Sequence, residues 1–165
     1  MKYTLSILIP ARNEEFIAHT VQDIVKNKRG KTEVIVGLDG AWPEKGVEII
    51  SHPDVRVVHV SESKGQRGMT NYICKLSKAK YVAKCDAHCG FDEGFDVKLM
   101  EKMQDDWTMV PVMRNFHVFN WRCKQCGDET YQGPVPEGCK SCDVNSSDEF
   151  EKSMVWRAKP SPQST

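Results

Sequence analysis

The fold of this protein is decided by residues 5–25, which read LSILIPARNEEFIAHTVQDIV. Leu5 to Ile9 is a short, almost wholly apolar run that Pro10 ends, as is typical of a buried strand. From Glu14 to Lys26 the apolar residues recur at the spacing of one helix face, and Gly30 follows, where a helix end favours glycine. This stretch therefore predicts a strand followed by a helix that packs one face against a sheet.

The same alternation of strands and helices continues to about residue 113. We expect further strands at Val34–Leu38, Val55–Val60, Tyr81–Cys85 and Thr108–Met113, and helices at Glu44–Ile50, about Gly68–Ser77 and Phe95–Met103. Such alternation needs crossover connections, which produce a mostly parallel sheet with helices on both faces. Ligands bind such sheets outside the carboxyl ends of the strands. Function is therefore expected in the segments that follow strands, namely Pro10–Glu15, Asp39–Pro43, Ser61–Arg67 and Asp86–Gly90.

Composition excludes several classes of protein. The 165 residues include 23 Lys and Arg and 23 Asp and Glu, so no overall charge attracts nucleic acid or an anionic membrane. No apolar run approaches the roughly 20 residues that span a bilayer, and the N-terminus lacks the cleavage site of a signal peptide. Seven cysteines without a secretory signal favour a reducing compartment, so we expect a cytoplasmic protein. The glycine patterns of Rossmann dehydrogenases and P-loop nucleotidases are both absent.

The stretch most informative for chemistry is residues 81–91, YVAKCDAHCGF. Asp86 and His88 are two residues apart at the end of a predicted strand, so a continued extended chain would point both side chains the same way. A carboxylate oxygen and an imidazole nitrogen suit a divalent ion such as Mn²⁺ or Mg²⁺. Such an ion bridges the phosphates of a nucleotide diphosphate and neutralises the leaving group. On spacing alone, the alternative is an aspartate that caps a turn beside an ordinary polar histidine.

Two C-x₂-C pairs form a second constellation, Cys123-Lys-Gln-Cys126 and Cys139-Lys-Ser-Cys142, separated by twelve residues. Four thiolates close a tetrahedral Zn²⁺ site with no open position, so the zinc is predicted to be structural. It would hold together a segment with little apolar periodicity. The alternative is a ribbon that grips a partner or nucleic acid, although its basic residues are too sparse to favour nucleic acid.

Three stretches together resemble the GT-A glycosyltransferases, specifically the large family 2. They are residues 5–25, residues 33–41 (EVIVGLDGA) and residues 78–94 (KAKYVAKCDAHCGFDEG). Asp86-Ala87-His88-Cys89 and the following DEGFDVKLMEKM are similar to the polypeptide N-acetylgalactosaminyltransferases, which use an Asp-x-His metal motif. The resemblance covers about residues 3–114. It implies a GT-A, Rossmann-like fold and a hexosyl- or N-acetylhexosaminyltransferase that uses a UDP-linked sugar. The two C-x₂-C pairs add a small four-cysteine zinc ribbon to this expected fold.

The resemblance also implies roles for individual residues. Pro10, Ala11, Arg12 and Glu14 match the loop that contacts the nucleotide; Asp39 matches the turn that binds uracil or ribose; Lys64 and Arg67 match basic groups near the diphosphate; Asp86 and His88 match the metal motif at the catalytic centre. The family's usual acidic pair is Leu38-Asp39 here. Plainer alternatives are a charge pair at a helix start for Arg12 and Glu14, a simple turn at Asp39-Gly40, and solvated surface charge for Lys64 and Arg67.

We expect three parts: a GT-A nucleotide-sugar-binding domain at 1–115, a zinc-ribbon-like insertion at 116–150 and a C-terminal tail at 151–165. Enzymes that the chain resembles have an acceptor-binding half, which we do not find in this sequence. They also have a third protein ligand of the metal, and His117 is the residue here that could stand in for it. We therefore expect donor binding with weak or no transfer to an unidentified acceptor by this chain alone; a homodimer or a longer natural chain would supply what is lacking. The alternative function is a non-catalytic scaffold that uses the ribbon for partner or nucleic-acid contacts.

Overall fold

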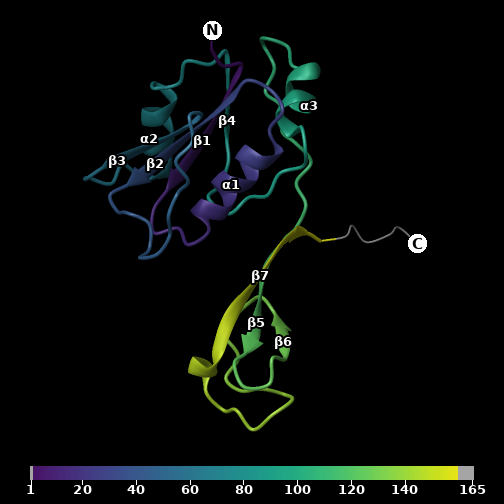
Figure 1. Ribbon diagram of the computed structural model, residues 1–165. Coiled ribbons are helices and arrows are strands. Elements are labelled where there is room, and N and C mark those ends of the chain that lie inside the picture. The colour runs from purple at the N-terminus through teal and green to yellow at the C-terminus, as the bar shows by residue number, and fades with distance from the viewer. Residues whose placement is uncertain (1, 160–165) are drawn as a thin grey trace. The chain divides into compact units, whose positions relative to one another are not determined.

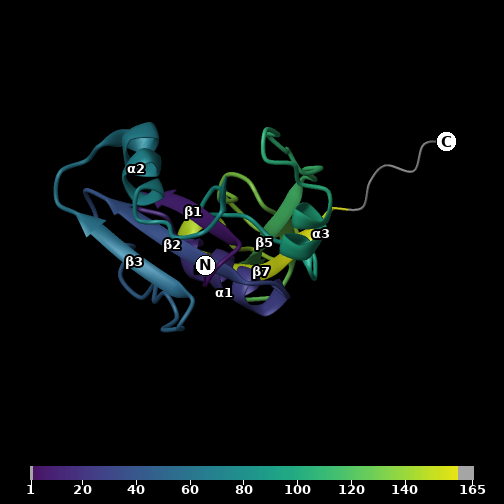
Figure 2. The ribbon, with the colours of Figure 1, turned by 90° about the horizontal axis from the view of Figure 1, so that it is seen from above.

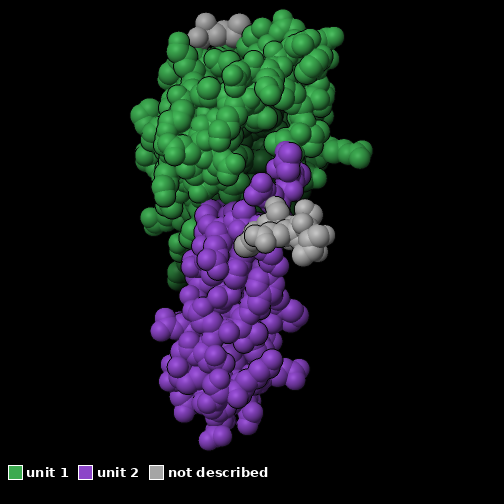
Figure 3. Space-filling model, turned by 90° about the vertical axis from the view of Figure 1, so that its right-hand side faces the viewer, with its two compact units in different colours: residues 1–111 green, residues 112–165 purple. Residues whose placement is uncertain are grey.

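The computed structural model describes residues 2–159. The chain divides into two compact units, residues 1–111 and 112–165 (Figure 3). No helix in the described part of the chain is long and apolar enough to cross a membrane.

The first unit is built on a four-stranded sheet in the order β3-β2-β1-β4, with every neighbouring pair parallel. Its strands are β1 (Leu5–Ala11), β2 (Thr32–Asp39), β3 (Val55–Val60) and β4 (Tyr81–Lys84), and its helices are α1 (Ile17–Asn27), α2 (Gly65–Cys74) and α3 (Phe95–Glu101) (Figure 1). The predicted α/β class with a parallel sheet is therefore confirmed. All four strands and all three helices lie where the sequence predicts them, with ends shifted by a few residues.

Different helices cover the two faces of this sheet (Figure 2). On β1, Leu5, Ile7 and Ile9 face α1 and join its buried residues in one core cluster. Leu8 points the other way, against Met69 and Ile73 of α2. Gly37 of β2 allows α2 to approach closely, because a Cβ at this position would lie 2.5 Å from the Met69 methyl carbon. Because successive side chains of a strand point to opposite faces, the strands contribute apolar residues to the packing against α1 on one face and against α2 on the other.

Strand β1 continues through Pro10, which the sequence predicts as its end. The carbonyl of Leu8 accepts a hydrogen bond from the Cys85 N–H at 3.1 Å, so Leu8 directs its backbone groups toward β4, and Pro10, two residues on, does the same. Strand β4 ends at Lys84, which pairs with Leu8. The missing N–H of Pro10 therefore interrupts no hydrogen bond of the sheet.

Two predicted elements are wrong. Residues 44–50 form no helix; Gly46 has a φ of 92° and the Val47 N–H donates to the Glu44 carbonyl at 3.0 Å, which makes a single turn. Residues 108–113 form no strand, and the side chains expected to pack lie in solvent, with Val110 80% and Val112 90% exposed. An apolar alternation needs a neighbouring strand, and none among the described residues pairs with this segment.

The second unit is a three-stranded antiparallel sheet in the order β6-β5-β7. It consists of β5 (Phe116–Cys123), β6 (Glu129–Tyr131) and β7 (Phe150–Ala158), with a short 3₁₀ helix η1 (Ser147–Glu149) before β7. The predicted tail at 151–165 is corrected over its first part, because β7 pairs with β5 from Cys123↔Phe150 to Phe116↔Ala158. The charged residues Glu151, Lys152 and Arg157 conceal this strand in the sequence. Residues 160–165 lie outside the described part.

Candidate functional site

The carboxyl ends of the four parallel strands carry the residues expected to bind a ligand. Pro10 and Ala11 are the last two residues of β1 and pair with Gly37 and Leu38 of β2. Both are buried, so they shape the rim with their backbone while the next residues present side chains to it.

Asp39, the last residue of β2, is only 4% exposed. Its Oδ1 accepts a hydrogen bond from the backbone N–H of Lys64 at 2.6 Å, and its Oδ2 accepts one from the hydroxyl of Ser63 at 2.8 Å. Burial alone would raise the pKa of this carboxyl, but these donors, the Gly65 N–H and the nearby Arg12 together hold the pKa below its ordinary value. Asp39 therefore anchors the segment between β3 and α2.

Arg12 reaches the same cluster from the loop after β1. Its Nη1 donates to Ser63 Oγ at 3.3 Å, and its guanidinium is exposed. The next residue, Asn13, has a φ of 53°, a left-handed conformation that asparagine adopts more readily than most residues. The turn at Asn13 lets the chain leave β1 while Arg12 stays beside Ser63. The structure thus brings together Arg12 and Asp39, which the sequence assigned to one rim.

The two basic residues of the next segment behave differently. The backbone N–H of Lys64 donates to Asp39, whereas the Lys64 ammonium lies 5.6 Å from the ring centroid of Tyr72 on α2. Arg67 is exposed in the first turn of α2. The hydroxyl of Ser63 accepts a hydrogen bond from Arg12 and donates one to Asp39. The sequence reasoning missed this residue, although a hydroxyl side chain directly before Lys64-Gly65 at a helix start was a signal.

Asp86 and His88 follow β4, but the extended conformation ends at Lys84 and residues 87–88 form a turn. The period-two argument that would align their side chains therefore does not apply. Asp86 forms an ion pair with the ammonium of Lys84, and His88 Nδ1 lies 3.6 Å from Glu14 Oε2. The predicted ligand Asp86 is thus paired with the basic residue Lys84, and the predicted ligand His88 with the acidic residue Glu14.

The side chain of Thr20 on α1 holds the turn at residues 87–88 through two hydrogen bonds. Its hydroxyl donates to the Ala87 carbonyl at 2.8 Å and accepts from the Cys89 N–H at 3.0 Å. Thr20 is fully buried, and its position on the apolar face of α1 was the available signal. The contact of Glu14 with His88 also joins the loop after β1 to the turn after β4, as expected if both belong to one site.

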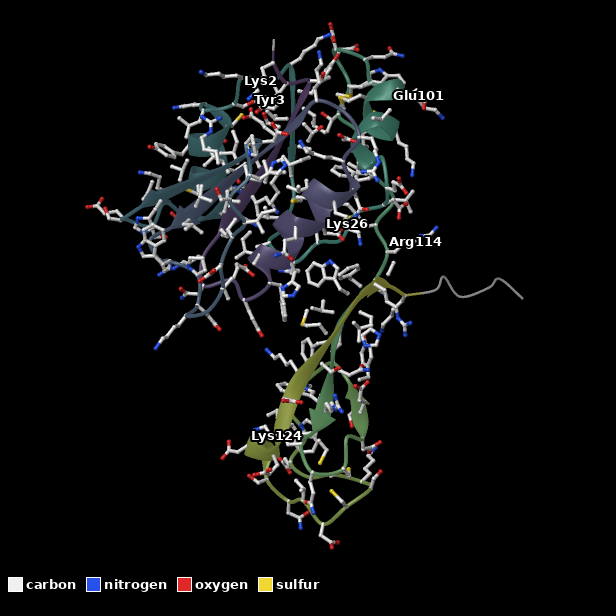
Figure 4. All side chains as sticks on the ribbon, in the orientation of Figure 1. Lys2, Tyr3, Lys26, Glu101, Arg114 and Lys124 are labelled. Carbon is white, nitrogen blue, oxygen red and sulfur yellow. The ribbon has the colours of Figure 1, made fainter. Side chains whose placement is uncertain are left out.

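The second unit holds the four cysteines of the C-x₂-C pairs. One sulfur ligand atom from each of them lies within 4.8 Å of all the others, a grouping that can hold a metal ion. Cys123 and Cys142 Sγ are 3.8 Å apart, and Cys126 and Cys139 Sγ are 3.5 Å apart. Lys124, which follows the first cysteine, lies near the start of β7 (Figure 4). Its Nζ donates to the Asp148 carbonyl at 2.6 Å.

His117 also belongs to the second unit, on β5. Its Nε2 lies 2.7 Å from Asn120 Oδ1, and its ring packs against Tyr131 with centroids 4.7 Å apart. His117, which the sequence suggested as a stand-in metal ligand, thus contacts Asn120 and Tyr131 of its own unit.

The first unit is thus an α/β protein, and the carboxyl ends of its parallel sheet are where such folds bind ligands. The chain belongs to glycosyl transferase family 2, whose family model matches residues 6–126. The matched range covers the parallel sheet except for its first residue, Leu5, and includes the first C-x₂-C pair. A search among curated proteins found no match. Membership implies a nucleotide-sugar donor and an acceptor, and enzymes of this family typically use a divalent metal.

Proposed function

We propose that this chain binds a UDP-linked hexose or N-acetylhexosamine at the rim of the parallel sheet and acts as the donor half of a sugar transfer to an acceptor. The observation that carries the proposal is the joining of Arg12 and Asp39 through Ser63, within a chain whose residues 6–126 match a glycosyltransferase family. The neighbouring segments that follow β1, β2 and β3 meet there.

The charges of this cluster support binding of a diphosphate. Arg12 is an exposed guanidinium, a group that pairs well with phosphate oxygens. The first turn of α2 adds a positive dipole end and the exposed Arg67. Asp39 supplies the anchor that keeps Ser63 and Lys64 in place. In this arrangement Asp39 positions the phosphate-binding segment rather than offering an open carboxylate.

Asp86 and His88 are the residues that would hold Mn²⁺ or Mg²⁺. The donor set fits: side chains of Asp86 and His88 are 42% and 55% exposed, and such ions need only one or two protein ligands because phosphate oxygens and water complete the shell. A bound ion would neutralise the charge of the departing diphosphate. Without the ion, the Asp86 carboxylate is paired with the ammonium of Lys84, which an incoming cation would have to displace.

We also propose that the four cysteines bind one structural Zn²⁺. A tetrahedral site with Zn–S bonds of about 2.3 Å places sulfur atoms about 3.8 Å apart, close to the 3.8 and 3.5 Å observed for two of the pairs. Backbone N–H groups already face the sulfurs, including Ser141 N–H at 3.4 Å from Cys139 Sγ. Hydrogen bonds from the Cys126 and Gln125 N–H groups lower the pKa of Cys123 to about 7, whereas burial and the neighbouring thiols raise the pKa of Cys126 and of Cys142. Without the metal, the thiolate is therefore favoured at Cys123.

The experiment that tests the donor site is a comparison of variants in the presence of Mn²⁺. Calorimetric titration of UDP into Asp86→Ala should show at least about a tenfold loss of affinity, the usual scale for removing a charged ligand contact. Asp106→Ala, which removes an exposed carboxylate outside the rim, should bind as the unchanged protein does. Equal binding by both variants would remove the assignment of Asp86, whereas an absence of UDP binding by the unchanged protein would favour the alternative of a non-catalytic scaffold.

A further inference from the structure

The indole of Trp42 is stacked flat on the imidazole of His59. The ring centroids are 4.4 Å apart and the planes differ by 7°. Trp42 is nevertheless 65% exposed, whereas His59 is half-buried on β3. The histidine therefore covers one face of the indole, and the exposed fraction leaves the opposite face to solvent.

This pair lies at the rim described above. Trp42 belongs to the segment after β2, and His59 pairs with Leu38, the residue before Asp39. Gly40 is held to β3 by its N–H, which donates to the Val60 carbonyl at 2.9 Å. A Cβ on Gly40 would come within 3.1 Å of Ser63 Cβ, so Gly40 touches the cluster. Two residues of chain span at most about 7 Å, which puts Trp42 near the same end of the rim.

The exposure of Trp42 argues against a purely structural role. A tryptophan that stabilises a core buries most of its large surface, and this one buries the smaller part. The stack on His59 fixes the orientation of the indole plane at little entropic cost, because both rings have few rotatable bonds. A fixed, half-covered aromatic plane beside cationic groups suits a second planar ring attached to a phosphate chain.

We propose that Trp42, backed by His59, is the platform on which the nucleobase of the donor stacks. The inference rests on the proposed function and deepens it. The resemblance assigns base or ribose recognition to Asp39, but the carboxylate oxygens of Asp39 already accept from Ser63 and Lys64. The base is then held mainly through its ring face by Trp42. The diphosphate extends from there toward Arg12 and the start of α2.

The test compares a ligand that has a base with one that lacks it. In Mn²⁺ buffer, Trp42→Ala should weaken UDP binding about tenfold, the scale of one base–aromatic stack, and leave the affinity for inorganic pyrophosphate unchanged. Trp42→Phe should retain most of the UDP affinity. Trp107→Ala, which removes another half-exposed tryptophan of the same unit, is the matched control and should bind both ligands normally. GDP should lose affinity in Trp42→Ala as well, because every base has a ring face.

The outcomes separate the platform from the proposed function. If the unchanged protein binds UDP but Trp42→Ala binds it equally well, or loses UDP and pyrophosphate in equal measure, the platform is overturned while the donor site stands. If the unchanged protein binds no nucleotide, the donor site and the platform both fall. A measurement on the unchanged chain needs no variant to fold: UDP should quench tryptophan fluorescence and pyrophosphate should not. Equal quenching by both, or by neither, would also overturn the platform.

Discussion

The backbone N–H of Lys64 donates a hydrogen bond of 2.6 Å to the carboxylate of Asp39, and this bond joins the end of β2 to the start of α2. Because Asp39 is buried, the same carboxylate that looks like a ligand contact in the sequence works as an anchor for the loop. The loop in turn presents Ser63 to Arg12. The donor site proposed above therefore depends on an aspartate that would not itself touch the donor.

Replacement of this anchor should cost stability and donor binding together. Asp39→Ala leaves the Lys64 N–H and the Ser63 hydroxyl without their acceptor, so we expect the free energy of unfolding to fall by about 2 kcal/mol. Urea denaturation followed by circular dichroism measures this loss, and Asp106→Ala is the exposed carboxylate control. A stability within about 0.5 kcal/mol of the unchanged protein would show that the loop is held by other contacts.

The lowered pKa of Asp39 also predicts a pH dependence. A carboxyl whose folded pKa lies below its ordinary value of 3.8 contributes stability that is fully present above that value and is lost as the pH falls through the folded pKa. Asp39→Asn should therefore reduce the difference in stability between pH 6 and pH about 3. Chemical denaturation at these two pH values measures the difference. An identical acid sensitivity in the variant would speak against a lowered pKa.

Replacement of Asp96 on α3 should lower the stability more than replacement of Asp39 does. It is 1% exposed and accepts hydrogen bonds from the Gly30 N–H at 2.9 Å, the Arg29 N–H at 3.0 Å and the Thr32 hydroxyl at 2.7 Å. These bonds tie α3 to the connection between α1 and β2. Asp96→Ala leaves the buried Thr32 hydroxyl and two partly buried N–H donors unpaired and should lower the free energy of unfolding by about 3 kcal/mol. Asp92→Ala, at an exposed position before α3, should have little effect in the same denaturation experiment.

Lys84 should compete with a divalent cation for Asp86. The ammonium of Lys84 forms an ion pair with the Asp86 carboxylate, so its removal frees the carboxylate and takes away a like charge. Lys84→Met is expected to raise the affinity for Mn²⁺ up to about fivefold, the scale of a partly exposed ion pair. Calorimetry or electron paramagnetic resonance of free Mn²⁺ measures it. Lys80→Met, which breaks the exposed pair with Asp105, is the control, and an equal gain in both variants would refute a specific competition.

The zinc proposal predicts one metal ion per chain. Metal analysis of the purified protein should find one Zn²⁺, and Cys126→Ser should lower that content and the stability of the second unit. Cys74→Ser, which changes a cysteine of α2 outside the cluster, should keep a full complement of zinc. Retention of one zinc per chain by Cys126→Ser would contradict the four-cysteine site.

The parallel sheet was predictable because its strands carry their signal locally. Residues 5–11 and 32–39 are buried along their whole length, and such strands are near-continuous apolar runs in the sequence. The failures have the opposite cause. Residues 108–113 show an apolar alternation with no strand beside it, and β7 shows a polar stretch that becomes a strand only through its pairing with β5. Pairing partners far along the chain leave no local mark.

The candidate site was predictable in its location but not in its contacts. The rule that ligands bind at the carboxyl ends of strands correctly grouped Arg12 with Asp39. It could not tell that the Asp39 carboxylate turns inward to Lys64, or that Asp86 pairs with Lys84, because side-chain partners depend on burial and on loop conformation. The stack of Trp42 on His59 was equally hidden, since the two residues come from segments that are far apart in the sequence and are brought together by the pairing of β2 with β3.

The most direct test of the central claim, that the rim binds a nucleotide-sugar donor, is calorimetric titration of the full chain with UDP in the presence and absence of Mn²⁺. The account predicts binding that strengthens when Mn²⁺ is present, because the ion would be held by Asp86 and His88 and would offset the charge of the diphosphate. The absence of UDP binding under both conditions would contradict the account.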